Sequence, residues 1–124
     1  MSSQVLPAGW PAAGDVFNSE CPSRAVLDHV TSKWAVLVLA ALMTGPMRFS
    51  ALRRRIGGVS EKMLAQSLRT LEADGFLDRE VAPTTPPQVT YSLTELGRGL
   101  TDHLTGLLDF ITTRIPDIES ARRS

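Results

Sequence analysis

The chain has 124 residues, a length that fits one domain with a substantial core and leaves little room for a second. Apolar residues make up 43% and charged residues 21% of the sequence, which excludes an intrinsically disordered chain. The formal net charge is zero, so affinity for a polyanion has to come from a local excess of basic side chains.

The segments that decide compartment point to the cytoplasm. The N-terminal MSSQVLPAGW has no basic region followed by an apolar run, so we expect no secretory signal. The most apolar stretch, 34–43, is ten residues long, whereas a membrane span needs about 20. We therefore expect a buried core helix and no membrane partner. Cys21 is the single cysteine, which excludes an intramolecular disulfide and favours a cytoplasmic protein.

The first third of the chain predicts an arm and two helices. Residues 1–19 contain proline, glycine and small polar residues, as expected of a loose N-terminal arm. Pro22 suits a first helical position, so a short helix is predicted from Pro22 to Thr31, with Cys21 at its cap. The next predicted helix, Lys33 to Thr44, is apolar nearly all round and should be central.

The following segments predict a helix-turn-helix. Residues 49–56 form a short helix pattern, and Gly57 and Gly58 connect it to a second helix. That second helix lies within 59–75, where Ser60 is a favourable N-cap and Gly75 a favourable C-terminal stop. One apolar stripe should face the core, and it consists of Leu64, Leu68 and Leu71.

Basic side chains are concentrated around this pattern. Between Arg48 and Arg69 the chain carries six basic residues and one acid, a distribution suited to DNA phosphates. Gln66 could pair with adenine and Arg69 with guanine in the major groove. A solvated helix face is the alternative for the three consecutive arginines. The residues predicted to contact DNA here are Arg48, Ser50, Arg53, Arg54, Arg55, Ser60, Lys62, Gln66 and Arg69.

After Gly75 the pattern changes to that of strands. Residues 76–82 and 89–93 predict a β-hairpin, and the proline-rich loop between them predicts a long tip. A hairpin directly after a recognition helix is a wing. Thr85 and Gln88 are the wing residues that we expect at the DNA, with Thr84 beside them.

The last predicted helix runs from Glu95 to Arg114, with Thr94 at its N-cap. Its apolar stripe is long for one small domain to cover, so a two-fold homodimer is expected, with intramolecular packing as the alternative. We expect a mainly α protein with a small β-hairpin wing (α+β), with a domain at 20–114 and a tail at 115–124. The expected dimer interface is Leu96, Leu100, Leu104, Leu107, Leu108 and Ile111.

Other chemistry is limited to Cys21. A thiol at a helix N-terminus is exposed to the helix dipole, which stabilises the reactive thiolate; a buried, inert cysteine is the alternative. His29 and His103 have no Cys, Asp or Glu at ligand spacing, so no metal site is expected. Nothing in the sequence places a catalytic triad or a Gly-rich phosphate loop. We expect no enzyme and no cofactor.

Several separated blocks resemble the HxlR family of bacterial winged-helix regulators, relatives of the MarR proteins. They are CP at 21–22, KW at 33–34, GPMRFSALRR at 45–54, S-E-K-M-L…L-R-x-L-E-x-D-G at 60–75, and PP-x-V-x-YSLTELG at 86–97. The resemblance implies a homodimer that binds inverted repeats in double-stranded DNA. In part of the family, the cysteine before the first helix senses quinones, diamide-type oxidants or hypochlorite.

The chain departs from the family pattern in the wing. Gln88 replaces an arginine that is frequent there, and Thr90 replaces an acid, so Gln88, Thr84 and Thr85 would have to make the wing contacts. The leading interpretation is a transcriptional repressor that responds to an electrophile or oxidant through Cys21. The alternatives are a regulator that senses a small molecule, with a structural Cys21, and a winged helix for protein–protein contact without DNA binding.

Overall fold

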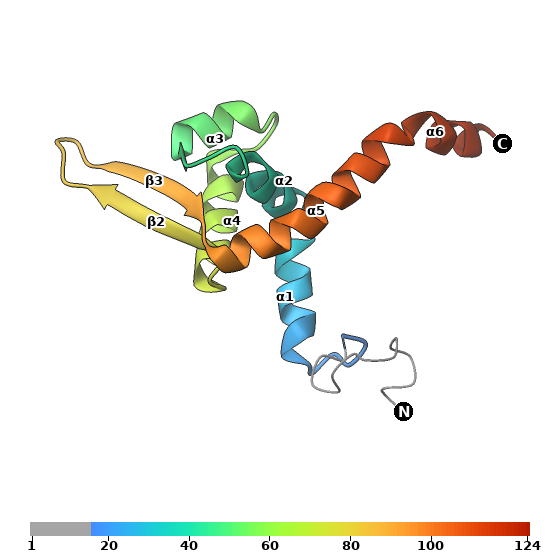
Figure 1. The fold of residues 1–124 in the computed structure, drawn as a ribbon, viewed down its shortest axis with the longest axis horizontal. Coiled ribbons are helices and arrows are strands. Elements are labelled where there is room, and N and C mark those ends of the chain that lie inside the picture. Colours follow the sequence, from blue (N-terminus) through green and yellow to red (C-terminus); the bar gives the residue numbers. More distant parts are fainter. Residues whose placement is uncertain (1–15) are drawn as a thin grey trace.

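The computed structural model describes residues 16–124, and residues 1–15, most of the expected arm, lie outside the described residues. Within 16–124 the chain forms six helices and one three-stranded antiparallel sheet, so the expected fold class is confirmed (Figure 1). The elements are α1 Pro22–Val30, α2 Lys33–Leu42, β1 Met47–Arg48, α3 Phe49–Arg55, α4 Glu61–Ala73, β2 Leu77–Ala82, β3 Gln88–Leu93, α5 Glu95–Thr113 and α6 Ile115–Arg123.

The elements form a central body with three projections (Figure 1). Helices α2, α3 and α4 make up the body, and α2 contacts both α4 and α5. The β2–β3 hairpin, helix α1 and the α5–α6 segment extend from it in different directions. Within the described residues no single helix is long and apolar enough to span a membrane, and the α1–α2 pair, which passes by length and composition, is bent by 73°.

Side-chain caps define the starts of three helices, and the sequence predicts two of them, Ser60 and Thr94. Ser32, Ser60 and Thr94 accept hydrogen bonds from the backbone N–H groups three residues ahead, at 3.2, 3.1 and 2.9 Å. Gly75 has φ +85° and follows α4, and the Phe76 N–H donates to the Leu71 carbonyl across it. This is a Schellman ending, in which glycine adopts the left-handed conformation at no steric cost.

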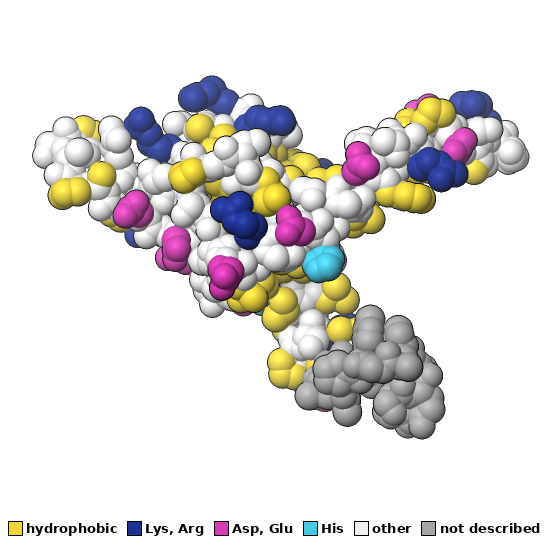
Figure 2. All heavy atoms as spheres, in the orientation of Figure 1, with side chains coloured by type: hydrophobic (Ala, Val, Ile, Leu, Met, Phe, Trp, Pro, Cys, Tyr) yellow, Lys and Arg dark blue, Asp and Glu magenta, His cyan; other side chains and the backbone are white. Residues whose placement is uncertain are grey.

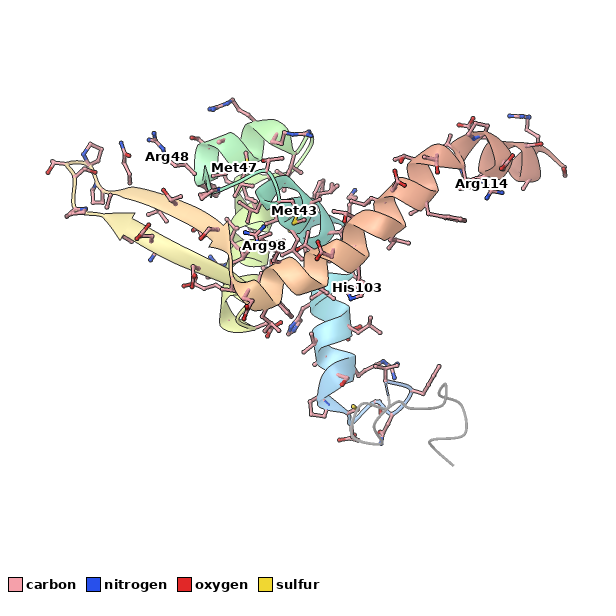
Figure 3. The ribbon with its side chains drawn as sticks, viewed as in Figure 1. Met43, Met47, Arg48, Arg98, His103 and Arg114 are labelled. Carbon is pink, nitrogen blue, oxygen red and sulfur yellow. The ribbon has the colours of Figure 1, made fainter. Side chains whose placement is uncertain are left out.

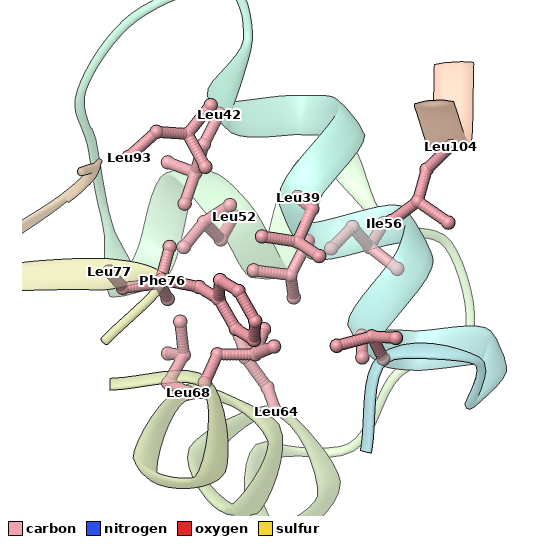
Figure 4. Packing of buried hydrophobic residues seen from close by; sticks show 14 of the residues in the cluster. Leu39, Leu42, Leu52, Ile56, Leu64, Leu68, Phe76, Leu77, Leu93 and Leu104 are labelled. Atoms are coloured by element: carbon pink, nitrogen blue, oxygen red, sulfur yellow. The ribbon is translucent and has the colours of Figure 1, made fainter. Parts of the chain in front are cut away.

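The core lies between α2 and the two helices of the helix-turn-helix, α3 and α4 (Figure 4). Leu64, Leu68 and Leu71 of α4 are at most 2% exposed, so the predicted apolar stripe of this helix is confirmed. They pack in one cluster with α2, with Leu52 of α3 and with Phe76, at the start of the hairpin. Burial of these side chains fixes which face of α4 remains in solvent.

The hairpin forms with a proline-rich tip, as expected. Strands β2 and β3 pair in register from Leu77 with Leu93 to Ala82 with Gln88, and 83–87 form the tip. The structure adds strand β1, whose Met47 pairs with Tyr91 on the other edge of β3. Two residues are too few to show an alternating pattern, which is why this strand was not expected.

The C-terminal end differs from the expected tail. Residues 115–123 form a second helix, α6, which begins with Pro116 in its first turn. Arg114, at the junction with α5, donates to Asp117 at 2.7 Å, and its guanidinium lies over the Phe110 ring at 5.6 Å. The segment is therefore ordered as a helix by local contacts, although all of its side chains are exposed.

Candidate nucleic-acid interface

Helix α4 presents a polar face opposite its buried leucines. Lys62, Gln66 and Arg69 are all exposed, while Leu64 and Leu68 are buried. Because α4 has 13 residues and an exposed polar face, it has the form of a recognition helix for the major groove. None of these three side chains forms a hydrogen bond or ion pair with another residue of 16–124, so their amide and cationic groups remain available to a ligand.

Two of the predicted DNA-contacting residues already have roles within the protein. Ser60 caps α4 by accepting from the Met63 N–H at 3.1 Å. Arg53 of α3 donates to Glu61 at 3.0 Å, joining α3 to the first turn of α4. Both partners of this ion pair are well exposed, at 48% and 73% of the side chain, so water screens it and its contribution to stability is small.

A polar hollow lies between α3 and the sheet. It has a volume of about 500 Å³ and brings together Arg48 from β1, Ser50 and Arg54 from α3, and Thr90 from β3. Figure 3 shows Arg48 between α3 and the hairpin. Two guanidinium groups at one hollow form a local positive site, which suits the oxygen atoms of a phosphate backbone.

The hairpin tip presents its polar groups to solvent. Thr85 and Gln88 are exposed, whereas the Thr84 hydroxyl donates to the Pro86 carbonyl at 2.8 Å and stabilises the tip itself. Thr85 of the tip and Gln88, the first residue of β3, therefore have free side chains for a wing contact.

Charge is distributed unevenly over the molecule. In Figure 2 basic side chains gather over α3 and beside the hairpin, while acidic side chains lie along the opposite edge of the hairpin and the first turns of α5. Arg54 and Arg55 belong to the basic side, and Asp78 and Glu95 are exposed acids of β2 and α5. The basic side chains of α3 therefore form a local positive surface on a protein whose formal net charge is zero.

Cys21 lies at the N-cap of α1, as predicted, and is 9% exposed. Its carbonyl accepts from the Arg24 N–H at 2.9 Å, and its N–H donates to the Asn18 carbonyl at 3.0 Å. The Arg24 guanidinium donates to the carbonyl groups of Val16 and Phe17, at 3.3 and 3.5 Å. Cys21 therefore combines the helix N-terminus that favours a reactive thiolate with the burial that is typical of an inert cysteine.

The apolar stripe of α5 divides into two parts. Leu104 is 7% exposed and belongs to the core, and Leu100 packs against that core from its edge. Their own subunit therefore already covers these two predicted interface residues. In contrast, Leu96, Leu107 and Ile111 are 60%, 51% and 39% exposed.

The exposed apolar surface also includes residues that the sequence pattern did not single out. Phe110 on α5, Ile115 and Ile118 on α6, and Val26 and Leu27 on α1 are all exposed. A hollow of about 340 Å³ lies between α2, the end of α3 and α5. It is bounded by Leu37 and Ala41 of α2, Ile56 and Leu108, with Arg55 at its edge.

The structure also reveals a polar pair that sequence reasoning missed. His29 Nδ1 donates to Asp74 Oδ2 at 2.6 Å, joining α1 to the residue that caps the end of α4. The two residues are 45 positions apart, so no local pattern signals the contact. Among the described residues no group of three or more His, Cys, Asp or Glu side chains is arranged to hold a metal ion.

Comparison with known proteins agrees with this geometry. Residues 29–119 match the model of the HxlR-like helix-turn-helix family. The chain is 55% identical over 120 residues to the HTH-type transcriptional regulator YtfH of Escherichia coli, covering 97% of this chain and 95% of YtfH. Its fold is similar to a solved structure of the transcriptional regulator ytfH from Salmonella typhimurium, with a TM-score of 0.84 and 55% identity, covering 87% and 96% of the two chains.

A solved structure of the redox regulator HypR in its reduced form is also similar, with a TM-score of 0.73 and 35% identity. It covers 80% of this chain and 98% of that one. The relatives and the family are transcriptional regulators and not enzymes, in agreement with the expectation from the residues. The chain belongs to the HxlR-like helix-turn-helix family of transcriptional regulators.

Proposed function

We propose that this regulator represses transcription by binding an inverted-repeat operator as a homodimer in the cytoplasm. The observation that carries the proposal is the division of α4 into a buried leucine face and an exposed face with Lys62, Gln66 and Arg69. In this account Gln66 and Arg69 contact base edges, because amide and guanidinium groups can form bidentate pairs with adenine and guanine. Lys62 contacts phosphate and orients the helix.

The remaining basic residues supply affinity that does not depend on sequence. Arg48 and Arg54 bind the DNA backbone at the polar hollow, and Arg55 extends the same face. Ser50, Thr85 and Gln88 add polar contacts to phosphate or the minor groove. Arg53 contacts the DNA after its ion pair with Glu61 breaks or its side chain turns toward the DNA. Ser60 acts mainly as the N-cap of α4.

The homodimer is proposed from the uncovered apolar surface. Leu96, Leu107 and Ile111 remain exposed on α5, together with Phe110 and the two isoleucines of α6. Leu108 is half-buried beside them. Burying this surface against a second copy would give a two-fold dimer, and an inverted repeat requires such a dimer to present both α4 helices to the same side of the DNA.

The test is binding of the purified protein to duplexes selected from its own upstream region, followed by footprinting. The proposal predicts a protected site with two half-sites about 10–10.5 base pairs apart or a multiple of that spacing. It also predicts an affinity that decreases steeply with salt concentration. Equal affinity for all duplexes at physiological salt would reject an operator-specific regulator and would favour the protein–protein module.

We further propose that Cys21 makes DNA binding responsive to electrophiles or oxidants. Its position at the N-cap of α1 supports a reactive thiolate, and the similar protein HypR is described as a redox regulator. Because the chain has one cysteine, oxidation has to end in a Cys21–Cys21′ disulfide between subunits, a mixed disulfide with a small thiol, or an adduct. The 9% exposure means that the helix must shift or open before a bulky reagent reaches the sulfur.

The experiment compares operator binding by wild type and Cys21→Ser, with and without diamide or a quinone. Release of wild type but not of Cys21→Ser would support the redox switch. If both proteins bind and neither responds, the redox proposal is rejected while DNA binding stands. A small-molecule effector is then the better candidate, and the hollow beside Arg55 is the site favoured by its apolar walls and single cation.

A further inference from the structure

The C-terminal end of α4 is attached to two other helices at once. Asp74 caps α4, and Gly75, with φ +85°, turns the chain toward the hairpin. His29 of α1 hydrogen-bonds to Asp74, and Thr94, the N-cap of α5, hydrogen-bonds to Gly75. The position of the recognition helix is therefore set at its end by the elements that carry Cys21 and the exposed apolar face.

On the α1 side the attachment is small and polar. Among the described residues of α1, Val30 alone is buried, so the helix has little apolar contact with the body. The neighbouring His29 donates to Asp74 at 2.6 Å, with side-chain exposures of 40% for His29 and 19% for Asp74. Partial burial protects this hydrogen bond from part of the screening that weakens the more exposed ion pairs, Arg53–Glu61 and Arg114–Asp117.

Asp74 is unfavourable for the helix that it ends. A carboxylate at a helix C-terminus faces the negative end of the helix dipole, and the last turn of α4 carries no basic residue to compensate it. The compensating group comes from α1, which lies far away in sequence. A residue that breaks a local rule and is satisfied by a distant partner is a candidate for a functional role.

On the α5 side the attachment is backbone-dominated and rigid. The Thr94 hydroxyl donates to the Gly75 carbonyl at 2.7 Å, and the Thr94 N–H donates to the Phe76 carbonyl at 3.1 Å. Gly97 lies so close to Phe76 that a Cβ atom there would overlap the Phe76 carbonyl. Helix α5 therefore holds the end of α4 from one side, and His29 is the adjustable contact on the other.

We propose that His29 and Asp74 are a positioning pair that sets the orientation of the recognition helix relative to α1. The proposal rests on the DNA binding proposed above and names the residues that regulate it. Neither residue contacts DNA. When the bond is present, α4 is held in the orientation that reads the operator; when it breaks, α4 pivots on its attachment to α5 and sequence discrimination decreases.

The test is a double-mutant cycle of His29→Ala, Asp74→Ala and the double variant. For each protein the dissociation constant is measured for the selected operator and for an unrelated duplex of equal length, with the melting temperature beside it. Each single change should weaken operator binding about threefold to tenfold, as expected for one partly buried hydrogen bond. Binding to the unrelated duplex should stay within about twofold, since phosphate contacts supply that affinity. The double variant should bind no worse than the weaker single.

Two matched variants control for general effects. His103→Ala removes the other histidine, which is exposed on α5, and Asp28→Ala removes an exposed carboxylate of α1 next to His29. Both should bind the operator like wild type. The positioning role would be overturned if the losses of operator affinity in the two single variants added up in the double variant. It would also be overturned if affinity for the operator and for unrelated DNA decreased equally, together with the melting temperature.

A measurement without DNA separates this inference from the proposed function. His29→Ala should increase amide hydrogen exchange at 71–76, around the end of α4, and leave 61–66 unchanged, because only the C-terminal end loses its tie to α1. Unchanged exchange at both ends would overturn the positioning pair. If the exchange result holds but wild type prefers no duplex, the proposed operator binding fails while the tie between α1 and α4 stands.

Discussion

Replacing Gly97 by alanine should destabilise the subunit, although alanine is the better helix former. Without a clash the substitution would gain about 1 kcal/mol of helix propensity. A Cβ atom at Gly97 would overlap the Phe76 carbonyl, which is backbone and cannot rotate away, so α5 has to shift. Overpacking of this kind costs about 1–3 kcal/mol, and a shift of α5 also breaks the 2.7 Å bond from the Thr94 hydroxyl to the Gly75 carbonyl, worth about 1 kcal/mol. The expected net loss is about 1–3 kcal/mol.

The assay is urea unfolding at constant protein concentration, since the proposed self-association would make the measured stability depend on concentration. Gly99→Ala is the matched control, because Gly99 lies on the same helix and a Cβ atom there would meet no atom within 4 Å. It should stabilise the protein by up to about 1 kcal/mol. If Gly97→Ala were as stable as Gly99→Ala, the close packing of α5 against the end of the recognition helix would be wrong.

Four further predictions concern single side chains. Leu104→Ala should cost about 2–5 kcal/mol of folding stability in urea unfolding, because Leu104 is in the core. Leu107→Ala should change the free energy of unfolding by less than about 0.5 kcal/mol, since Leu107 is 51% exposed. It should weaken self-association measured by sedimentation; an unchanged dimer dissociation constant would show that Leu107 is not in the interface. Arg54→Ala should reduce the slope of log affinity against log salt by about 1 and leave the preference between duplexes unchanged. Ser60→Ala should cost about 1 kcal/mol of stability through its lost cap, and a loss in DNA binding alone would contradict that assignment.

Local signals in the sequence were sufficient to predict most of the helices. The hydroxyl groups of Ser60 and Thr94 cap helices by accepting from the backbone N–H three residues ahead. Gly75 adopts a left-handed conformation that glycine favours. The spacing of Leu64, Leu68 and Leu71 indicated the buried face of α4, and thereby the exposed one. These features depend on residues within one or two turns, which is why a single sequence reveals them.

Features that depend on distant partners could not be predicted in this way. Strand β1 exists because Met47 meets Tyr91, and the His29–Asp74 bond joins residues 45 positions apart. The apolar residues of α5 follow one continuous helical spacing in the sequence. In the structure, however, α2 and its neighbours cover Leu104 and leave Leu107 in solvent. Helix periodicity identifies the apolar face but not which part of it the subunit's own core covers.

The most direct test of the central proposal is a base-by-base binding profile of the selected operator with wild type, Gln66→Ala and Arg69→Ala. Each variant should lose about 1–3 kcal/mol of discrimination at one position in each half-site, with adenine affected by Gln66 and guanine by Arg69. Both variants should remain folded, because both side chains are exposed. If both retained the affinity and base preference of wild type, α4 would not be the helix that reads DNA through this face.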